Sequence, residues 1–255
     1  MAYFTFQGFF HSPAIPMIGL QSKTEHDIFG ESTITSKYNS YGYRTDEFND
    51  KLNKYIVISG CSLTEGYALT LDQTWHKKLE QKLNIPLVNL AKNGANAEFV
   101  SQNLTNWIDS NCNKPLSMII QWPNPMRLLH WKDGQSVFVI PSHNYDELYK
   151  LKIINGNEYF FVNWIQSIIK LDVLCKSKGI PILHLHFEFP TKLDAVLDIL
   201  KQNNIELHLD YKVPHKSWKK DYAAPDKLHH SEQCNEQWAD RIYKLLTLRR
   251  DICLV

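Results

Sequence analysis

The chain has 255 residues, enough for one large domain or two small ones and for a substantial hydrophobic core. Apolar residues make up 44% and charged residues 22%, so disordered, collagen-like and fibrous classes are excluded. Lys and Arg total 28 against 27 Asp and Glu, a formal charge of +1. This balance provides no overall field for nucleic acid or anionic lipid, so neither nucleic acid nor a membrane is expected as a partner.

The cysteines and the apolar N-terminal residues indicate the cellular compartment in which the protein works. Five cysteines without C-x-x-C spacing argue against a disulfide framework or a structural zinc site, and favour a reducing compartment. The apolar start lacks basic residues and is interrupted by Pro13 and Pro16, so we expect no cleaved signal and no transmembrane helix. The sequence therefore predicts a cytoplasmic protein with a single domain over 1–255, on which residues 1–50 pack as a leading segment.

Short apolar runs alternate with helical patterns along the rest of the chain. Residues 54–59 form a continuous β-branched run before Gly60, typical of a buried parallel strand. Further strands are expected at 87–90, 117–122, 181–187 and 205–209, and helices at 73–83, 96–109, 158–178, 192–203 and 232–248. This alternation predicts an α/β fold with an open five-stranded parallel sheet covered on both faces. The stretches 123–157 and 210–230 are predicted to be long irregular loops.

Four loops contain residues that are suited to acyl transfer. Ser62 follows the first strand, at a sheet edge where we expect an exposed side chain. Gly94 follows the second strand, Asn124 follows the third, and Asp226 precedes His229 by three residues before the last helix. Taken singly, these are ordinary caps, turns and surface residues. Taken together, they provide a nucleophile, two oxyanion donors and an Asp-oriented base.

These residues resemble the SGNH hydrolases, also called GDSL-like esterases. Residues 60–66, GCSLTEG, are similar to block one of that family with Ser62 at the nucleophile position, while Gly94 and Asn124 match blocks two and three. The D-x-x-H of block five is matched by Asp226 and His229, and the stretch NSYGYR before block one resembles one found in some branches. The resemblance implies a three-layer α/β/α sandwich with a flavodoxin-like sheet.

The resemblance also implies a mechanism that needs no metal and no cofactor. Ser62 would attack an ester carbonyl, His229 would carry the proton and Asp226 would orient the imidazole. The oxyanion would be held by the backbone N–H groups of Ser62 and Gly94 and by the Asn124 amide.

The expected substrate is a small-molecule or carbohydrate ester, with O-acetyl esters first and lipid esters or thioesters second. Trp122, Arg127 and Trp131 flank the predicted cleft and are the candidate substrate-binding residues. Arg44 and Arg127 either bind an anionic group or pair with surface acids, and the second interpretation has more weight.

The sequence differs from the family pattern at several positions. Cys61 replaces the usual Asp of block one, and Trp122 and Pro125 replace the Gly and Asp that flank the block-three Asn. Cys61 could be a reactive thiol beside the site. His229 is preferred over the adjacent His230 because only His229 has an Asp three residues earlier.

Two alternatives remain open. The altered residues around Asn124 fit a non-catalytic ligand-binding module that kept the SGNH fold. The spacing of His184, His186 and His208 on neighbouring strands fits a metal-dependent hydrolase, although imidazoles in apolar strands are more often hydrogen-bonded core residues.

Overall fold

A computed structural model describes residues 22–26, 33–48, 53–111, 113–132, 135–139, 145–187, 194–209 and 229–249. Its centre is a five-stranded, all-parallel sheet in the order β4-β3-β5-β8-β9. The strands are β3 (Ile56–Ser59), β4 (Leu87–Asn89), β5 (Ser117–Gln121), β8 (Ile182–His186) and β9 (Leu207–Leu209). The predicted fold class and sheet are confirmed.

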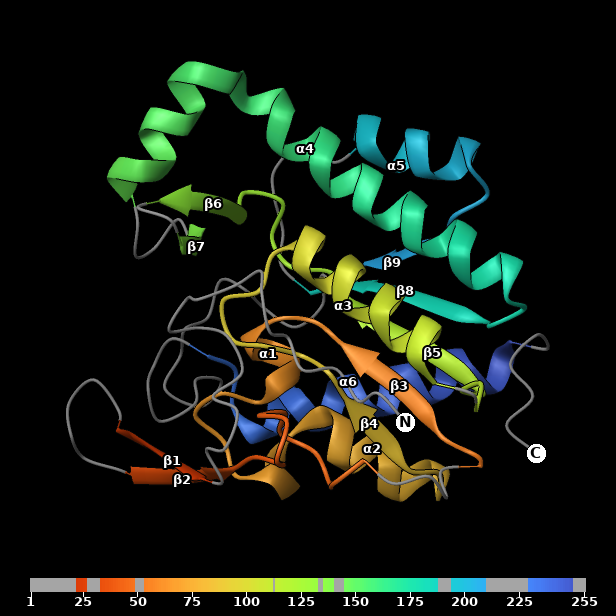
Figure 1. Ribbon diagram of the computed structural model, residues 1–255. Helices are drawn as coiled ribbons and strands as arrows, with labels where there is room; N and C mark the ends of the chain where they lie inside the picture. The colour runs from red at the N-terminus through yellow and green to blue at the C-terminus, as the bar shows by residue number, and fades with distance from the viewer. Residues whose placement is uncertain are drawn as a thin grey trace.

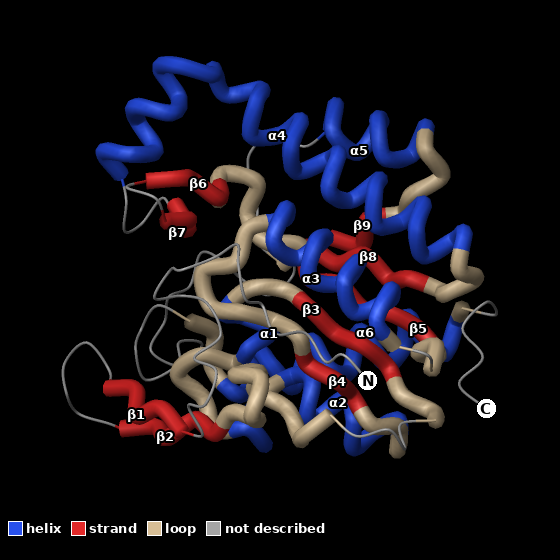
Figure 2. The backbone as a smooth tube through the Cα atoms, viewed as in Figure 1, coloured by secondary structure: helices blue, strands red, loops and turns tan. Residues whose placement is uncertain are grey.

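The helices cover both faces of the sheet (Figures 1 and 2). One face is covered by α3, α4 and α5, and the other by α2 and α6. The helices are α1 (Ser62–Glu65), a short 3-10 helix (Leu71–Gln73), α2 (Trp75–Leu83), α3 (Ala97–Ser110), α4 (Tyr145–Ser177), α5 (Asp194–Gln202) and α6 (Glu232–Leu248). No helix in the described ranges is long and apolar enough to cross a membrane.

The two faces follow from the alternation of side chains along each strand. Val57 pairs with Val88 on one side and Met118 on the other, and all three are buried in the core beneath α3 and α4. The next residues, Ile58 and Ile119, also pair with each other and are buried in the core beneath α2 and α6. Strands that are buried on both faces have unbroken apolar sequences, and for this reason their positions could be predicted from the sequence.

The chain between β5 and β8 differs from the prediction. Helix α4 begins at Tyr145, whereas the sequence predicted a helix over 158–178 after an irregular loop at 123–157. The helix runs through Gly156, whose cost of roughly 1 kcal/mol is small enough for a long helix to tolerate. The same predicted loop also contains the antiparallel hairpin of β6 (Leu128–Lys132) and β7 (Gln135–Val139), and a second unpredicted hairpin joins β1 (Ser22–His26) to β2 (Thr33–Lys37).

The strand order sets the position of the functional loops. The chain passes from β3 to β4 on one side and then returns to β5 on the other side of β3. Open parallel sheets bind ligands at the carboxyl ends of the strands where the order reverses in this way. The loops after β3, β4 and β5 meet at this reversal, and they contain Ser62, Gly94 and Asn124.

Candidate functional site

Ser62 is the first residue of α1, on the turn that follows β3. The helix ends after one turn at Gly66, whose φ is +84°, and the N–H groups of Gly66 and Tyr67 donate to the Ser62 carbonyl over 2.9 and 3.0 Å. The expectation of an exposed serine is wrong, since Ser62 is only 3% exposed. Ser62 is therefore buried within the turn at the carboxyl end of β3.

Gln121, the last residue of β5, ties this turn to the neighbouring strand. Its Oε1 accepts hydrogen bonds from the Cys61 N–H (3.3 Å) and the Thr64 hydroxyl (3.1 Å), while its Nε2 donates to the Trp122 carbonyl (2.9 Å). A Cβ on Gly60 would lie 2.5 Å from Thr64 Oγ1 and 2.8 Å from Gln121 Oε1, so glycine is required there. This role of Gln121 could not be predicted from the sequence, because Cys61 and Thr64 are far from it in the chain.

Cys61 is fully buried and its Sγ lies 3.3 Å from Gln121 Oε1. The thiol is thus part of the contacts that hold the turn. This placement argues against an exposed reactive thiol beside the site.

Gly94 lies in a tight turn between β4 and α3. The Ala95 N–H donates to the Lys92 carbonyl over 3.1 Å, and Gly94 has a φ of +79°, a conformation that glycine adopts without strain. Asn96 then caps α3 by accepting from the Phe99 N–H over 2.9 Å. Gly94 is therefore held just before a helix N-terminus, where backbone donors favour negative charge.

Asn124 is held in a turn of its own after β5. Its Oδ1 accepts from the Met126 N–H over 2.9 Å and its carbonyl accepts from the Arg127 N–H over 3.0 Å. The preceding residue, Pro123, is fixed by a 2.7 Å hydrogen bond from the Trp164 indole. With Oδ1 held in this way, the amide presents its Nδ2 group as the donor.

Trp122 is a core residue, so its predicted role in substrate binding is wrong. It is fully buried, and its indole N–H donates to His184 Nδ1 over 2.9 Å. His184 Nε2 in turn lies 3.2 Å from Asp172, which also pairs with Lys176 over 2.7 Å. Burial lowers the pKa of His184. Because its Nδ1 accepts from Trp122, its Nε2 is the nitrogen that donates to Asp172. Burial opposes the charge on Asp172, but hydrogen bonds from His184 and Lys176 outweigh it and lower that pKa.

These contacts also exclude the histidine metal site. Both ring nitrogens of His184 are occupied, and His186 Nδ1 lies 2.9 Å from the Trp122 carbonyl. His208 pairs with Leu185 in the sheet register, so it lies on the face opposite His184 and His186. Within the residues that the structure describes, no three His, Cys, Asp or Glu side chains gather as a metal site.

The two adjacent histidines before α6 face different surroundings. The His229 ring packs 5.0 Å from the ring of Tyr67, whose N–H is bonded to the Ser62 carbonyl. The His230 ring instead packs edge-on against Trp238 of α6, at 4.7 Å. His229 is thus the imidazole beside the serine turn.

Comparisons with known proteins identify the fold. No protein-family model and no curated protein matches the chain. Among solved structures, the psychrotrophic esterase EstA from Pseudoalteromonas sp. matches with a TM-score of 0.52 and 15% identity, over 77% of this chain and 97% of that chain. A carbohydrate esterase whose active site displays divergent catalytic and non-catalytic binding functions matches with a TM-score of 0.54 and 12% identity, over 81% and 68% of the two chains. The chain has the fold of the SGNH, or GDSL-like, esterases.

Identities at this level establish the SGNH fold alone, and the roles of the site residues stay predictions. Asp226 lies outside the described residues, as does the side chain of Trp131. Arg127 is half-buried next to Asn124. Arg44 is 3% exposed and donates to backbone carbonyls. This placement fits neither the binding of an anionic group nor a pair with a surface acid, the two roles expected from the sequence.

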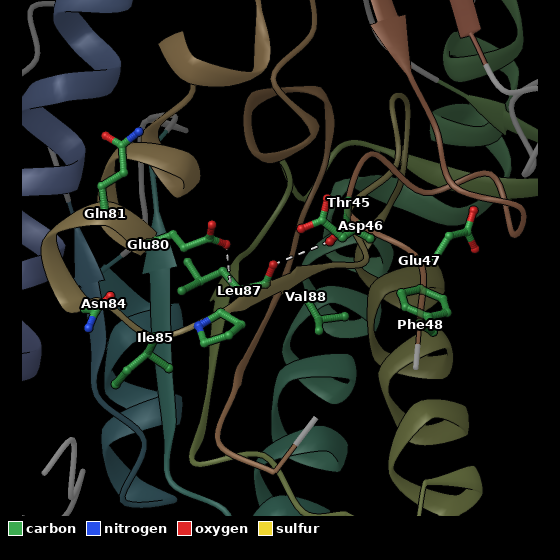
Figure 3. Close-up of a pocket in the computed structure, with 11 residues that line it drawn as sticks. Thr45, Asp46, Glu47, Phe48, Glu80, Gln81, Asn84, Ile85, Leu87 and Val88 are labelled. Carbon is green, nitrogen blue, oxygen red and sulfur yellow. Dashed lines mark hydrogen bonds between the residues drawn. The ribbon is translucent and has the colours of Figure 1, made fainter. Parts of the chain in front are cut away.

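A cavity of about 460 Å³ lies at the other end of the sheet, near the start of β4 (Figure 3). The polar side chains nearest to β4, those of Glu80 and Thr45, already have partners. Glu80 accepts from the Leu87 N–H over 3.0 Å and pairs with Lys77, and the Thr45 hydroxyl donates to the Leu87 carbonyl over 3.4 Å. This cavity is remote from the carboxyl edge of the sheet, so it is not the site that the SGNH fold would use.

Proposed function

We propose that the chain is a serine hydrolase of small acyl esters. Ser62 Oγ attacks the ester carbonyl while His229 accepts its proton and returns it to the leaving alcohol, which leaves an acyl group on Ser62. Water then attacks this acyl group, with His229 again acting as the base. Asp226 holds the imidazole in the required tautomer, and the N–H groups of Ser62 and Gly94 with the Asn124 amide stabilise the oxyanion.

The observation that carries this proposal is that the loop after β3 is hydrogen-bonded both to the loop after β4 and to the last residue of β5. The Lys92 N–H, after β4, donates to the Gly60 carbonyl, after β3, over 3.2 Å. Gln121, at the end of β5, accepts from Cys61 and Thr64. Such fixed loops favour catalysis, because donors that are already in place need no reorganisation as charge develops.

A short acyl group, acetyl above all, is the proposed substrate class. A small cavity of about 10 Å³, room for about one water-sized group, lies between α4 and the two donor loops and is lined by Asn96, Pro125, Phe160 and Trp164 among others. This cavity borders the Asn124 turn through Pro125 and Arg127, and the small room there favours a short acyl group. A carbohydrate remains the proposed carrier of the ester, although the buried Trp122 gives it no stacking surface.

A substrate panel with serine labelling tests the proposal. The protein is assayed on p-nitrophenyl acetate, butyrate and octanoate and on acetylated sugars, and is treated with a fluorophosphonate. We expect acetyl esters to be hydrolysed fastest and the label to be found on Ser62. Absence of both hydrolysis and labelling would reject the esterase.

Replacement of Asn124 should lower kcat. Asn124→Ala removes a donor that acts on the developing oxyanion, so we expect kcat to fall about 10²-fold while KM changes little. Asn203→Ala is a matched control, since Asn203 is exposed and its Nδ2 bonds only to its own helix. A change in KM alone would make Asn124 a substrate-binding residue.

Cys61 is expected to be dispensable for chemistry. Cys61→Ser retains a donor toward Gln121 and Cys61→Ala removes it, and both variants should keep most of kcat/KM on p-nitrophenyl acetate. Mass spectrometry of the protein trapped with substrate should find the acyl group on Ser62. An acyl group on Cys61 would reverse the order of the nucleophiles.

A non-catalytic binding module is the second candidate function. It is favoured by the buried Trp122 and by Pro125, which replace the family residues on both sides of Asn124. In this case acetylated sugars would bind, as measured by calorimetry, and neither hydrolysis nor labelling of Ser62 would occur.

A further inference from the structure

The segment Asn39–Arg44, which contains the NSYGYR stretch, is folded around the side chain of its first residue. Asn39 Oδ1 accepts from the N–H groups of Tyr41 (3.1 Å) and Tyr43 (2.9 Å), and the Asn39 N–H donates to the Tyr43 carbonyl (2.8 Å). Gly42 provides the required φ of +76°. This turn directs Arg44 into the protein.

Arg44 contacts the backbone directly after the Ser62 helix. Its guanidinium donates to the carbonyls of Glu65, Gly66 and Leu69, which form the chain that leaves α1. The planar fork of an arginine can serve several carbonyls at once, which the ammonium of a lysine cannot do in the same geometry. Arg44 therefore fixes the end of the one-turn helix that begins at Ser62.

The same segment contacts the loop that contains Gly94. Lys92 is buried, and its ammonium donates to the Gly42 carbonyl and lies 4.7 Å from the centre of the Tyr43 ring. The Lys92 carbonyl accepts from Ala95 across the Gly94 turn over 3.1 Å. The segment thus contacts both loops. It reaches the backbone after α1 through the Arg44 side chain, and it reaches the Gly94 loop through the Lys92 side chain.

We propose that Asn39–Arg44 is a brace that sets the position of the Ser62 turn relative to the Gly94 turn. Arg44 and Lys92 are its positioning residues, and neither needs to touch the substrate. The catalytic consequence rests on the proposed function, because the oxyanion donors of Ser62 and Gly94 must converge on one oxygen. The structural consequence, a rigid pair of loops, does not depend on it.

The kinetic test replaces Arg44 in the full chain. Arg44→Lys should lower kcat on p-nitrophenyl acetate about 10- to 100-fold, with KM within about twofold of the wild type, because positioning affects the transition state more than the ground state. In Arg44→Ala, added guanidinium at millimolar concentration should restore part of kcat, while equal sodium chloride should not. Arg249→Lys is the matched control, since Arg249 also donates to a carbonyl, that of Ile182 (2.9 Å), at the opposite end of the sheet.

Amide hydrogen exchange tests the brace without any reaction. Arg44→Lys should speed exchange about 10-fold in peptides covering 62–69, and Lys92→Met should do so in peptides covering 92–96. Peptides from α6 should be unchanged in both variants. If the Arg44 variants fail to fold, Lys92→Met still tests whether Asn39–Arg44 holds the two loops in position.

The outcomes separate the two proposals. Unchanged exchange and unchanged kcat in either folded variant would overturn the brace. Loss of kcat without guanidinium rescue, together with faster exchange throughout the chain, would also overturn it, because Arg44 would then only support global stability. If the wild type shows neither ester hydrolysis nor labelling but exchange responds locally, the brace stands and the esterase is rejected.

Discussion

Replacement of Ser62 by alanine should abolish ester hydrolysis. The substitution removes only the attacking oxygen, so we expect kcat/KM on p-nitrophenyl acetate to fall about 10³-fold or more. Labelling by the fluorophosphonate should disappear at the same time. The Ser62 backbone remains bonded to Gly66 and Tyr67, so the turn itself should persist.

Ser59→Ala is a suitable control for this experiment. Ser59 is also buried, lies three residues earlier, and loses one hydroxyl hydrogen bond, to the Leu90 carbonyl over 3.3 Å. We expect this variant to keep its activity and its circular dichroism spectrum. Full activity in a folded Ser62→Ala variant would refute the assignment of the nucleophile.

The adjacent histidines allow an equally sharp comparison. His229 packs beside Tyr67 at the serine turn, whereas His230 packs on Trp238 in α6. His229→Ala should therefore eliminate turnover, while His230→Ala should lower thermal stability and leave kcat largely intact.

Asp226→Asn extends the same comparison and should be intermediate. The variant loses the charge that stabilises the imidazolium but leaves the His229 ring in place. Steady-state kinetics of the three variants decide the assignment. An inactive His230→Ala with an active His229→Ala would show that the last family block is aligned one residue out of register.

The sheet was predictable because its signals are local. Ile56–Ser59 and Ser117–Gln121 are short apolar runs, and each ends where the next loop begins. The start of α4 was missed because Gly156 resembles a turn residue, and only the length of the surrounding helix compensates for it.

The site was only partly predictable. The motif positions of Ser62 and Asn124 could be found because family spacing is a property of the sequence. The burial of Trp122 could not, since its partner His184 is 62 residues away. The role of Arg44 was hidden for the same reason, because its partners are backbone carbonyls that no side-chain pattern reveals.

The cavity beside β4 has a consequence for association between molecules. β4 is an edge strand of three residues. The N–H of Ile56 in β3 donates to the carbonyl of Pro86, the residue before Leu87. The N–H and carbonyl of Leu87 therefore point away from β3. The side chains of Glu80 and Thr45 occupy both of these outward groups. A foreign strand would therefore find no unpaired backbone group at Leu87 and little length for a ladder. In this way the chain protects that edge of its sheet against strand addition and aggregation.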